Sequence, residues 1–503
     1  MTAIAASGSW RRSIRGRPAI CRRGATNAAC RRAISLRSSE LIGVSGITAD
    51  SRAVRPGYLF AALPGAKADG RRFIAEAVAR GAVGVLAPEG STWPPGVPPR
   101  PLFCTASPRT RLAELAVELA GPPPERLVAV TGTNGKTSTV DFLRQLLCGS
   151  GRRAASLGTL GLIAPGIPPA ETLTTPDPVT LANTLAALAR EGVTEVAMEA
   201  SSHGIEQSRL DGLRFAAAGF TNLTRDHLDY HGSMAAYRDA KLRLFEALVQ
   251  RGAPVFAMAD LEGETLAALR EIAARRRLEL RTVAADATTP LPGGQEISSG
   301  GRRVTLNLPG RFQADNAVLA AALAEALGVP DAFARLADLA PVRGRLERAL
   351  VLPNGAAAYV DYAHTPDAIA RVLSALRPHA AGRLVIVLGA GGDRDAGKRP
   401  LMGQAAAAGA DTVIVTDDNP RSENPAAIRA AILAAAPEAR EIGDRRAAIA
   451  AGLDGLRKGD VLVVAGKGHE QGQIVAGEVI PFDDAAVLRE LAGAEHKSLD
   501  GSA

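Results

Sequence analysis

Residues 131–138, with the sequence Thr-Gly-Thr-Asn-Gly-Lys-Thr-Ser, constrain the fold of this chain more than any other stretch. The apolar residues 127–130 that precede them are typical of a short buried strand, and residues 140–147 that follow place apolar side chains at helical spacing. A strand, a glycine-bearing turn with Lys-Thr and a helix have the order of a phosphate-binding loop. The motif predicts an α/β domain with a phosphate site at the end of a strand.

The glycines, the lysine and the hydroxyls of this loop each have a physical role in binding phosphate. Glycines let the backbone N–H groups converge on phosphate oxygens, and the helix N-terminus adds its partial positive charge. Lys136 would reach the β- and γ-phosphates, and the Thr137 hydroxyl would bind Mg²⁺. The common form G-x-x-x-x-G-K-S/T has a glycine where this chain has Val130. A chance turn of this composition is the alternative, but the lysine, the hydroxyl pair and the strand–helix context favour a phosphate loop.

Length and composition set the fold class. A chain of 503 residues is long enough for about three domains. A hydrophobic content of 47% with only 4% aromatic residues indicates cores of Ala, Leu and Val, as in parallel sheets covered by helices. No apolar run approaches the roughly 18 residues that a membrane helix needs, which predicts a soluble protein. The four cysteines are scattered, which favours a reducing compartment without disulfides: Cys21, Cys30, Cys104 and Cys148.

The net charge of +7 belongs to one end of the chain. Residues 1–39 contain nine arginines and no acidic residue or lysine, so subtracting them from +7 leaves −2 for the rest. We therefore expect no nucleic-acid partner, because the basicity lies in a tail rather than on a folded surface. The tail is typical either of an organelle transit peptide or of unstructured sequence upstream of the folded body, and we favour the second.

The first part of the body, from Glu40, has alternating strand and helix patterns. Residues 57–63 and 81–87 are expected to be strands, and Asp69 is expected to open a helix that runs to Arg80. The Pro-rich residues 93–99 indicate a surface loop. This part contains no catalytic constellation.

Beyond the Gly-Pro-Pro-Pro stretch at 121–124, apolar strands alternate with Ala/Leu-rich helices, as in a mainly parallel sheet. The strand predicted over 193–199 ends in Glu199, and ligands in such sheets lie at the carboxyl ends of strands. Glu199 is thus placed to hold Mg²⁺, directly or through water, although a solvated glutamate is the alternative.

Two polar features follow that strand. The His–Asp–His pattern within 226–231 is compatible with zinc, but a polar loop beside a nucleotide site fits better because no helical H-E-x-x-H accompanies it. Residues 237–245 have the pattern of an amphipathic helix. By spacing alone, Lys241 on this helix is most simply a surface lysine.

A further domain begins near Pro341. Strands predicted over 357–361, 383–389, 411–416 and 460–465 each run into a loop rich in charged or glycine residues. Loops that follow parallel strands meet at one sheet edge, so they predict a second small-molecule surface. The glycine-rich loop at 389–395 is only a weak match to a dinucleotide-binding loop.

Together these stretches resemble the Mur ligases of cell-wall synthesis from about Ile47 to Phe482. The T-G-T-N-G-K-T loop marks the wider superfamily, which includes folylpolyglutamate and cyanophycin synthetases. The stretches 173–176, 199–204 and 237–241 narrow the resemblance, and Asp-Asn-Pro-Arg at 418–421 is similar to the signature of the members that add diaminopimelate. Since that family is chiefly bacterial, the resemblance favours unstructured upstream sequence over a transit peptide.

The resemblance implies an α/β fold in three domains behind a basic disordered tail over 1–39. Residues 40–120 would form a small N-terminal domain for the UDP-linked substrate. Residues 121–340 would form a central ATP-binding domain of the P-loop type with a mainly parallel sheet, and residues 341–503 a Rossmann-like amino-acid-binding domain.

The resemblance also assigns site residues by their match to the family motifs. Residues implied to bind ATP are Gly132, Thr133, Asn134, Gly135, Lys136, Thr137, Ser138, Asn316, Arg345, Asp361 and His364. Residues implied to bind the UDP-linked substrate are Ala49, Ser51, Ala66, Lys67, Ala68, Thr174, Thr175, Ser201, Gln207 and Arg209. Residues implied to bind diaminopimelate are Arg394, Asp418, Asn419, Pro420, Arg421, Gly466 and Glu470. Residues implied in catalysis are Lys136, Glu199, His227 and Lys241, with Thr137, Glu199, His227 and carbamylated Lys241 as ligands of two Mg²⁺ ions.

In this resemblance Lys241 would carry a carbamate, which turns a cation into an anion suited to a site near metals. Arg394 and Arg421 would pair with the distal carboxylate of diaminopimelate, and Glu470 with its distal ammonium. Two departures from the family motifs, Gln313 in place of Asn and Leu346 in place of Met, touch no proposed charge.

The implied activity is amide formation driven by ATP. ATP would phosphorylate the D-glutamyl carboxylate of UDP-N-acetylmuramoyl-L-alanyl-D-glutamate, and the amine of meso-diaminopimelate would displace the phosphate. The expected partners are these small molecules, without nucleic acid or membrane, for a monomer in the cytoplasm. Two alternatives stay open: a related ligase for another amino acid, and a P-loop switch or nucleotide-binding module that catalyses nothing.

Overall fold

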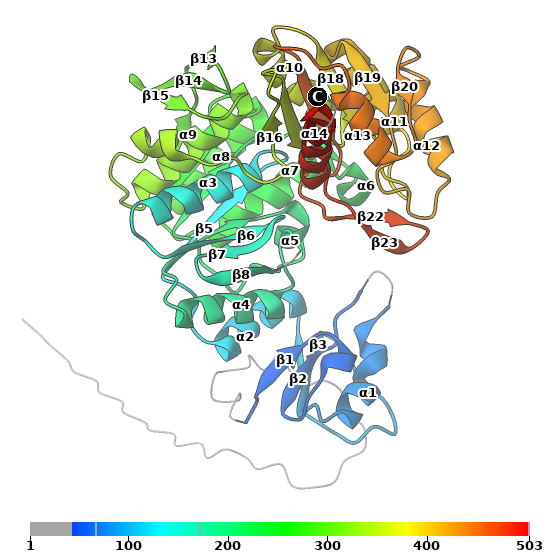
Figure 1. The fold of residues 1–503 in the computed structure, drawn as a ribbon. Coiled ribbons are helices and arrows are strands. Elements are labelled where there is room, and N and C mark those ends of the chain that lie inside the picture. The colour runs from blue at the N-terminus through cyan, green and yellow to red at the C-terminus, as the bar shows by residue number, and fades with distance from the viewer. Residues whose placement is uncertain (1–42, 66–67, 171–172, 501–503) are drawn as a thin grey trace, which may run out of the picture. The chain divides into compact units, whose positions relative to one another are not determined.

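The protein is described by a computed structural model that covers residues 43–65, 68–170 and 173–500 (Figure 1). The predicted tail over 1–39 and two predicted substrate residues, Ala66 and Lys67, lie outside the described residues. The chain forms two compact units: one comprises residues up to Val44 and Thr48–Pro108, and the other Ser45–Ile47 and the chain from Arg109 onward. Each unit is built around mixed α/β layers, which confirms the predicted fold class.

A small sheet has the strand order β1-β2-β3-β4, and its strands β2, β3 and β4 lie in the first unit. Its strands are β1 (Gly46–Thr48), β2 (Tyr58–Ala61), β3 (Gly84–Pro88) and β4 (Leu102–Thr105). The last three are parallel, and α1 (Ile74–Ala79) packs its Ile74 and Val78 on Phe60 and Val85. The helix expected from Asp69 begins instead as a 3₁₀ turn over Gly70–Phe73, where Asp69 accepts a hydrogen bond from the backbone N–H of Arg71.

The second unit contains an eight-stranded sheet in the order β12-β11-β10-β5-β9-β6-β7-β8. Its strands are β5 (Arg126–Thr131), β6 (Ala154–Gly158), β7 (Gly161–Ala164), β8 (Ile167–Ala170), β9 (Glu195–Glu199), β10 (Ala217–Phe220), β11 (Pro254–Met258) and β12 (Glu279–Val283). The six strands from β12 to β6 are parallel, while β7 and β8 are antiparallel. This confirms the predicted mainly parallel sheet.

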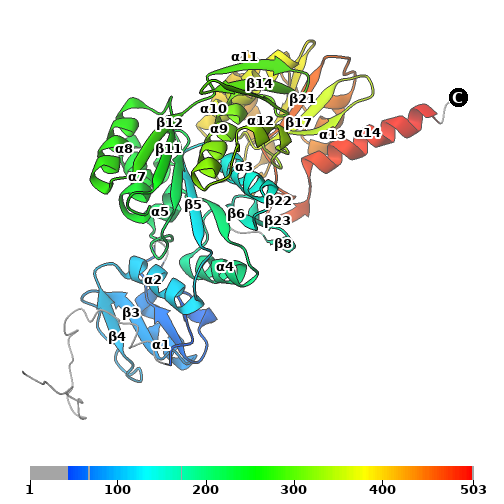
Figure 2. The same ribbon diagram turned by 90° about the vertical axis from the view of Figure 1, so that its left-hand side faces the viewer.

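Alternation along β5 shows why both faces of this sheet are covered. Leu127 and Ala129 lie in the core beneath α4 (Pro178–Arg190) and α8 (Gly263–Arg276). Val128 and Val130 lie in the core beneath α3 (Lys136–Gly149) and α9 (Arg311–Ala326), which run side by side in both views (Figures 1 and 2). A strand that is apolar on both faces needs such helices on both sides.

A second, six-stranded sheet has the order β16-β17-β21-β18-β19-β20. Its strands are β16 (Glu347–Val351), β17 (Ala357–Asp361), β18 (Leu384–Leu388), β19 (Thr412–Val415), β20 (Arg440–Glu441) and β21 (Val461–Ala465). All are parallel except β16, so the loops after β17, β18, β19 and β21 emerge at one edge, as predicted.

Helices cover both faces of this sheet too, and smaller elements complete the unit. The covering helices are α10 (Pro366–Leu376), α11 (Lys398–Gly409) and α12 (Pro425–Leu433) on one face, with α13 (Arg445–Leu453) and α14 (Asp484–Asp500) on the other. A hairpin of β22 (Gly472–Val475) and β23 (Glu478–Pro481) follows β21. A separate three-stranded sheet contains β13 (Ala287–Leu291), β14 (Gly294–Ser299) and β15 (Arg302–Leu306).

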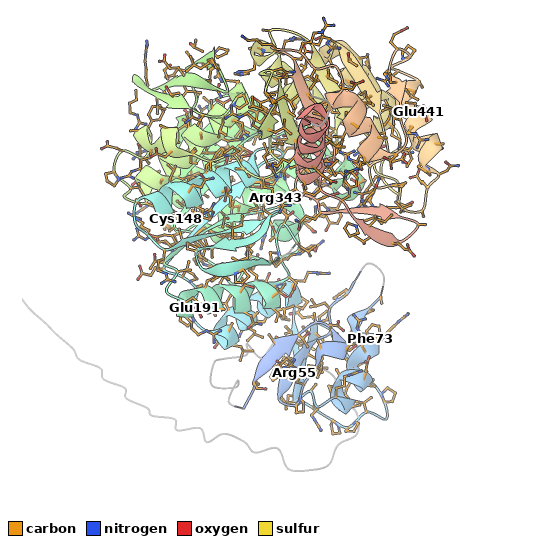
Figure 3. All side chains as sticks on the ribbon, in the orientation of Figure 1. Arg55, Phe73, Cys148, Glu191, Arg343 and Glu441 are labelled. Carbon is orange, nitrogen blue, oxygen red and sulfur yellow. The ribbon has the colours of Figure 1, made fainter. Side chains whose placement is uncertain are left out.

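Two sequence expectations about cysteine and membrane segments can be compared with the structure. Neither Cys104 in β4 nor Cys148 in α3 forms a disulfide with another described residue. Figure 3 labels Cys148. Of the helices in the described ranges, none is both long enough and apolar enough to cross a membrane.

A buried ion pair attaches α14 to the edge of the second sheet. Arg445 and Asp484 are both 0% exposed, and the guanidinium donates two hydrogen bonds to the carboxylate, at 2.8 and 2.7 Å. Arg445 also donates to the carbonyls of Asp417 and Ala465, at 3.3 and 3.0 Å, just beyond β19 and at the end of β21. One side chain therefore joins a helix N-terminus to the ends of two strands.

We predict that Arg445→Met destabilises the protein strongly. The substitution leaves the Asp484 carboxylate buried without its partner, which costs about 3–5 kcal/mol. The matched control is Arg446→Met, which breaks an exposed pair with Glu490 and is expected to cost about 0–1 kcal/mol. Guanidinium unfolding of both variants measures the difference, and equal midpoints would contradict the role given to Arg445.

Candidate active site at two sheet edges

The loop between β5 and α3 requires glycine at two positions. Gly132 has a φ of +138°, and a Cβ there would lie 1.9 Å from the Thr221 hydroxyl oxygen. Gly135 has a φ of +86°, and a Cβ there would lie 2.3 Å from the Asn316 side-chain oxygen. Both glycines thus permit a positive φ and a close approach that a side chain would prevent.

Residues after β10 hold this loop in place. The backbone N–H groups of Thr133 and Asn134 donate to the main-chain and side-chain oxygens of Asn222, at 2.8 and 3.0 Å. The Thr221 hydroxyl donates to the carbonyl of Asn134 at 2.6 Å. No side chain caps α3, whose N-cap residue is Gly135, so its N-terminus can receive an anion. The predicted strand–loop–helix geometry is confirmed.

Two lysines converge on one backbone oxygen of this loop. The Gly132 carbonyl accepts from Lys136 Nζ at 3.0 Å and from Lys241 Nζ at 2.8 Å. The interpretation of Lys241 as a surface lysine is wrong, because its side chain is 1% exposed and its Nζ lies 4.3 Å from the Tyr237 ring centroid. The prediction from helical spacing was wrong because Lys241, on α7 (Met234–Arg243), contacts the phosphate loop, which is far away in the sequence.

Both lysines have a lowered pKa, but the charges near them differ. Burial lowers the pKa of Lys136, while the carboxylates of Glu199 and Asp226 oppose this shift. Burial also lowers the pKa of Lys241 well below its usual value, and the nearby positive charge of Lys136 lowers it further. Both effects make it easier for the Lys241 ammonium to lose its proton.

Glu199 ends β9 as predicted, but it is not the solvated glutamate of the alternative interpretation. Its side chain is 1% exposed and accepts from the Thr159 backbone N–H at 2.7 Å and from the Thr159 hydroxyl at 3.2 Å. A Cβ at Gly158 would lie 2.2 Å from its Oε1, so a glycine at that position makes room for the carboxylate. These contacts fix the carboxylate on the strand edge.

Five of the residues expected to bind the UDP-linked substrate form one connected group beside Glu199. The Thr174 hydroxyl lies 3.2 Å from that of Thr159, and the Thr175 hydroxyl lies 3.0 Å from that of Ser201. Arg209 donates to the Thr175 carbonyl at 2.6 Å and to the Gln207 side-chain oxygen at 2.8 Å. The structure therefore brings these five predicted residues together.

His227 lies in a cluster of rings next to this group. Its ring centroid is 4.9 Å from that of His203 and 6.3 Å from that of Tyr237, whose hydroxyl donates to Thr133 Oγ1 at 3.3 Å. Within the described ranges, no three His, Cys, Asp or Glu side chains converge in a way that could hold a metal, so the zinc interpretation finds no support there. The start of this polar segment lies beside the phosphate loop instead. The Thr133 hydroxyl donates to the Thr224 carbonyl at 3.1 Å, and Asp226 lines the same cavity as Thr133.

The four residues outside the phosphate loop that were predicted to bind ATP line a cavity of about 350 Å³ together with this loop. Arg345 donates to the Thr137 hydroxyl at 3.1 Å, and its guanidinium carbon lies 4.5 Å from the Tyr362 ring centroid. Burial raises the pKa of Asp361 to about 6, although Arg345 and two backbone N–H groups favour the carboxylate. His364 and Asn316 complete the lining, so the four predicted residues meet at one cavity.

The predicted amino-acid residues lie at the edge of the second sheet. Arg421, with a φ of +52°, donates from its guanidinium to the Gly392 carbonyl at 2.8 Å, in the loop that also carries Arg394. A Cβ at Gly466 would lie 2.6 Å from the Asp418 carboxylate. Among the described residues, neither Arg394 nor Arg421 forms an ion pair. Both arginines are thus available to an anionic ligand.

The loop at 389–395 is bonded to the loop after β19. Gly392 donates its backbone N–H to Asn419, and the Ser422 hydroxyl donates to Asp393 at 2.6 Å. Arg399 donates to the Glu423 carboxylate at 2.8 Å. These bonds orient the loop toward the predicted amino-acid residues, and they give no support to the dinucleotide interpretation.

Several residues of these sites were missed by the sequence analysis. Asn222 holds the phosphate loop, and Thr159 holds Glu199. Lys467 is buried among the residues predicted to bind the amino acid, and Arg399 donates to Glu423 in the loop after β19. None carries a local pattern that distinguishes it from a loop or helix residue. The glycines on either side of Lys467 were the one available signal, because they indicate a tightly packed loop.

Three described residues from the predicted UDP-substrate set lie in the first unit. Ala49 and Ala68 are exposed, while Ser51 is buried and donates its hydroxyl to Glu76 at 2.8 Å.

The phosphate loop on a parallel sheet, the buried strand-end carboxylate and the second charged sheet edge define an α/β protein of the P-loop type. The sequence matches the Mur ligase family, catalytic domain over residues 43–101, the Mur ligase middle domain over 130–324, and the Mur ligase, glutamate ligase domain over 344–468. This chain belongs to the Mur ligase family.

Two curated relatives align with this chain over nearly their whole length. The UDP-N-acetylmuramoyl-L-alanyl-D-glutamate--2,6-diaminopimelate ligase of Caulobacter vibrioides is 52% identical over 477 residues, which are 90% of this chain and 96% of the relative. The enzyme of the same name from Rhizobium meliloti is 49% identical over 90% of this chain and 95% of its own.

Solved structures agree with this assignment. A UDP-N-acetylmuramoyl-L-alanyl-D-glutamate--2,6-diaminopimelate ligase matches with a TM-score of 0.66 and 33% identity, covering 90% of this chain and 95% of that one. A MurF ligase from Thermotoga maritima in complex with ADP matches with a TM-score of 0.60 over 91% of this chain and 99% of its own. At 19% identity, the second likeness shows the fold alone.

We predict that Gly135→Ala abolishes nucleotide binding. Its new methyl group would meet the Asn316 oxygen at the phosphate loop, so affinity should fall at least about 100-fold. Gly151→Ala is the matched control, because Gly151 has a similar φ of +84° but nothing within 4 Å of a Cβ. Calorimetric titration with ATP separates the two, and unchanged binding by Gly135→Ala would contradict the role of this loop.

Proposed function

We propose that this chain is an ATP-dependent ligase that adds meso-2,6-diaminopimelate to UDP-N-acetylmuramoyl-L-alanyl-D-glutamate, a step of peptidoglycan precursor synthesis. The observation that carries the proposal is a chain of hydrogen bonds. It runs from the edge of the sheet that bears the phosphate loop to the residues expected to bind the UDP-linked substrate. Glu199 accepts from Thr159, and the Thr159 hydroxyl lies 3.2 Å from that of Thr174. A phosphoryl donor and a substrate carboxylate bound at these groups meet at one edge.

The chemistry follows from the poor leaving ability of a carboxylate oxygen. A D-glutamyl carboxylate oxygen attacks the γ-phosphorus of ATP, ADP leaves, and an acyl phosphate forms. The amine of diaminopimelate attacks the carbonyl carbon, inorganic phosphate leaves, and the nitrogen loses a proton. Lys136 and the α3 N-terminus stabilise the phosphate charge, while exclusion of water protects the acyl phosphate from hydrolysis.

Lys241 acts in this proposal as a carbamate. Two ammonium groups on the Gly132 carbonyl repel one another, whereas a carbamate at Lys241 would be attracted to Lys136. The carbamate forms when the neutral amine of Lys241 attacks the carbon of CO₂ and the nitrogen releases a proton. The lowered pKa of Lys241 favours the neutral amine that this step requires. Burial of the side chain also protects the product from bulk water.

The donor groups fit Mg²⁺, which prefers oxygen ligands. Thr137, Glu199, His227 and a Lys241 carbamate are the residues proposed to hold two Mg²⁺ ions, and Lys241 must lose its positive charge before a cation can lie near it. When bound, Mg²⁺ supplies neutralisation of phosphate charge. The residues of this chain position the phosphate loop, the Glu199 carboxylate and the substrate carboxylate that accepts the phosphoryl group.

We further propose one domain per substrate, with the boundaries 40–120 for the UDP-linked substrate, 121–340 for ATP and 341–503 for the amino acid. Ala49, Ser51 and Ala68 belong to the first, and Ala66 and Lys67 are assigned to it by family resemblance alone. We also propose that the protein acts as a monomer in the cytoplasm, without a membrane or nucleic-acid partner. The cytoplasmic location of ATP and of UDP-linked precursors supports the proposed compartment.

Phosphate release from ATP tests this function directly. UDP-N-acetylmuramoyl-L-alanyl-D-glutamate is supplied with each candidate amino acid, and phosphate is measured against time. We expect release to depend on the dipeptide substrate and on diaminopimelate, with lysine at least about 10³-fold less effective because its use leaves arginines unpaired. Equal use of lysine would contradict the diaminopimelate assignment, and release without any amino acid would contradict a ligase.

We predict that Lys241→Ala lowers kcat at least about 100-fold, because it removes an anion that offsets charge at the phosphate loop. Formate or acetate should restore part of the activity by occupying the vacated site. Lys458→Ala, which changes an exposed lysine, is the control and should behave as the unmodified enzyme. Full activity of Lys241→Ala would exclude the carbamate role.

We predict that Arg421→Ala raises the KM for diaminopimelate by about 10²–10³-fold, because the distal carboxylate loses a guanidinium partner. The KM values for ATP and the UDP-linked substrate should barely change. Arg440→Ala, an exposed arginine on β20, serves as the control. Steady-state kinetics with each substrate varied in turn measures all three, and a small uniform effect would mean that Arg421 has no role in amino-acid recognition.

A further inference from the structure

Lys467 is a buried cation that the proposed reaction does not use. It follows β21 and its side chain is 0% exposed. Its Nζ donates to the Asn419 side-chain oxygen at 3.1 Å, to the Glu470 carboxylate at 3.2 Å and to the Gly472 carbonyl at 2.5 Å. One ammonium thus joins the loop after β19, its own loop and the first residue of β22.

These contacts fix which way the Asn419 amide points. Its oxygen accepts from Lys467 and from the backbone N–H of Ile474 at 2.9 Å, so that end of the amide faces two donors. Its nitrogen is consequently turned toward Glu470, to which it donates at 2.8 Å. An amide in the opposite orientation would place two donors against two donors and leave Glu470 without this bond.

The same region sets the backbone of Arg421. The Arg421 N–H donates to the Ile474 carbonyl at 3.0 Å, and the Ala476 N–H donates to the Arg421 carbonyl at 2.8 Å. Arg421 has a φ of +52°, a conformation that a non-glycine residue adopts only when its surroundings hold it. The hairpin that Lys467 and Asn419 bind at Gly472 and Ile474 therefore also positions Arg421.

The charges around Lys467 leave room for a second cation. Its Nζ lies 3.9 Å from the Asp418 carboxylate and 3.2 Å from that of Glu470. The other buried cation near these two carboxylates, Arg445, is already paired with Asp484. A ligand ammonium beside Glu470 would complete the charge balance, and a ligand carboxylate would pair with Arg421. This arrangement suits the far end of an amino acid that carries both groups.

We propose that Lys467 is a positioning residue that determines amino-acid specificity. It orients Asn419 and Glu470 toward the distal ammonium and, through the β22 backbone, aligns Arg421 with the distal carboxylate. The inference rests on the proposed function, and it adds that selectivity for a substrate with both distal groups depends on a buried residue that does not itself contact the substrate.

The test compares Lys467→Met with Lys458→Met, an exposed lysine changed in the same way. We expect the Lys467→Met protein to fold and its KM for diaminopimelate to rise at least about 30-fold, because the polar groups that face the amino acid lose their orientation. The KM values for ATP and for the UDP-linked substrate should change less than about 3-fold, because the loss is local. The preference for diaminopimelate over lysine should fall at least about 10-fold. Lys458→Met should match the unmodified enzyme throughout.

A double-mutant cycle with Asn419→Leu separates positioning from a merely structural role. If Lys467 acts through Asn419, the double variant should lose no more than about 3-fold in kcat/KM for diaminopimelate beyond Lys467→Met alone, because coupled residues are not additive. The proposal would be overturned if the loss in kcat/KM of the double variant equalled the product of the two single losses. An unchanged KM for diaminopimelate in Lys467→Met would also overturn it. A Lys467→Met protein that does not fold by circular dichroism would also overturn it, since the residue would then serve the fold. Failure of the proposed function is distinct, because the unmodified enzyme would then not use diaminopimelate.

Discussion

The convergence of Lys136 and Lys241 on the Gly132 carbonyl is the interaction on which the first site depends. Two buried ammonium groups at one oxygen are stable only where anions compensate them. The loop supplies such a place, because its glycines hold the backbone open for phosphate and Glu199 lies buried at the neighbouring strand end. A carbamate on Lys241 would convert this repulsion into attraction. In the proposed reaction, the bound substrates would complete this arrangement of charges.

The second site uses the same topological feature with different chemistry. Parallel strands β17, β21, β18 and β19 bring their carboxyl ends to one edge, where a phosphate loop is replaced by guanidinium groups and carboxylates. Buried ions hold this edge together: Arg445 bonds the strand ends to α14, and Lys467 bonds the loops to the β22–β23 hairpin. In the proposed function, nucleotide and amino acid would bind to similar scaffolds whose side chains differ in charge.

The local pattern of the sequence predicted the strands and the loop well, because apolar runs and glycine spacing are local properties. The residues at 131–138 and the strand ending at Glu199 were found in this way. Burial of Lys241 was not predicted from spacing, since it arises from contact with Gly132, 109 residues away. Asn222, Thr159 and Lys467 likewise act through contacts between distant loops. The positive φ of Arg421 has no sequence signal at all, because the hairpin imposes it.

The central claim is that the phosphate loop activates a substrate carboxylate by phosphorylation, and isotope transfer tests it most directly. The D-glutamyl carboxylate of the UDP-linked substrate is labelled with ¹⁸O in both oxygens, and the reaction is run with ATP and diaminopimelate. Mass spectrometry then measures the label in the released phosphate and in the product. The account predicts one ¹⁸O atom in each phosphate and one in each new amide. Unlabelled phosphate accompanying amide formation would contradict it, because the carboxylate oxygen would then not have been transferred to phosphorus.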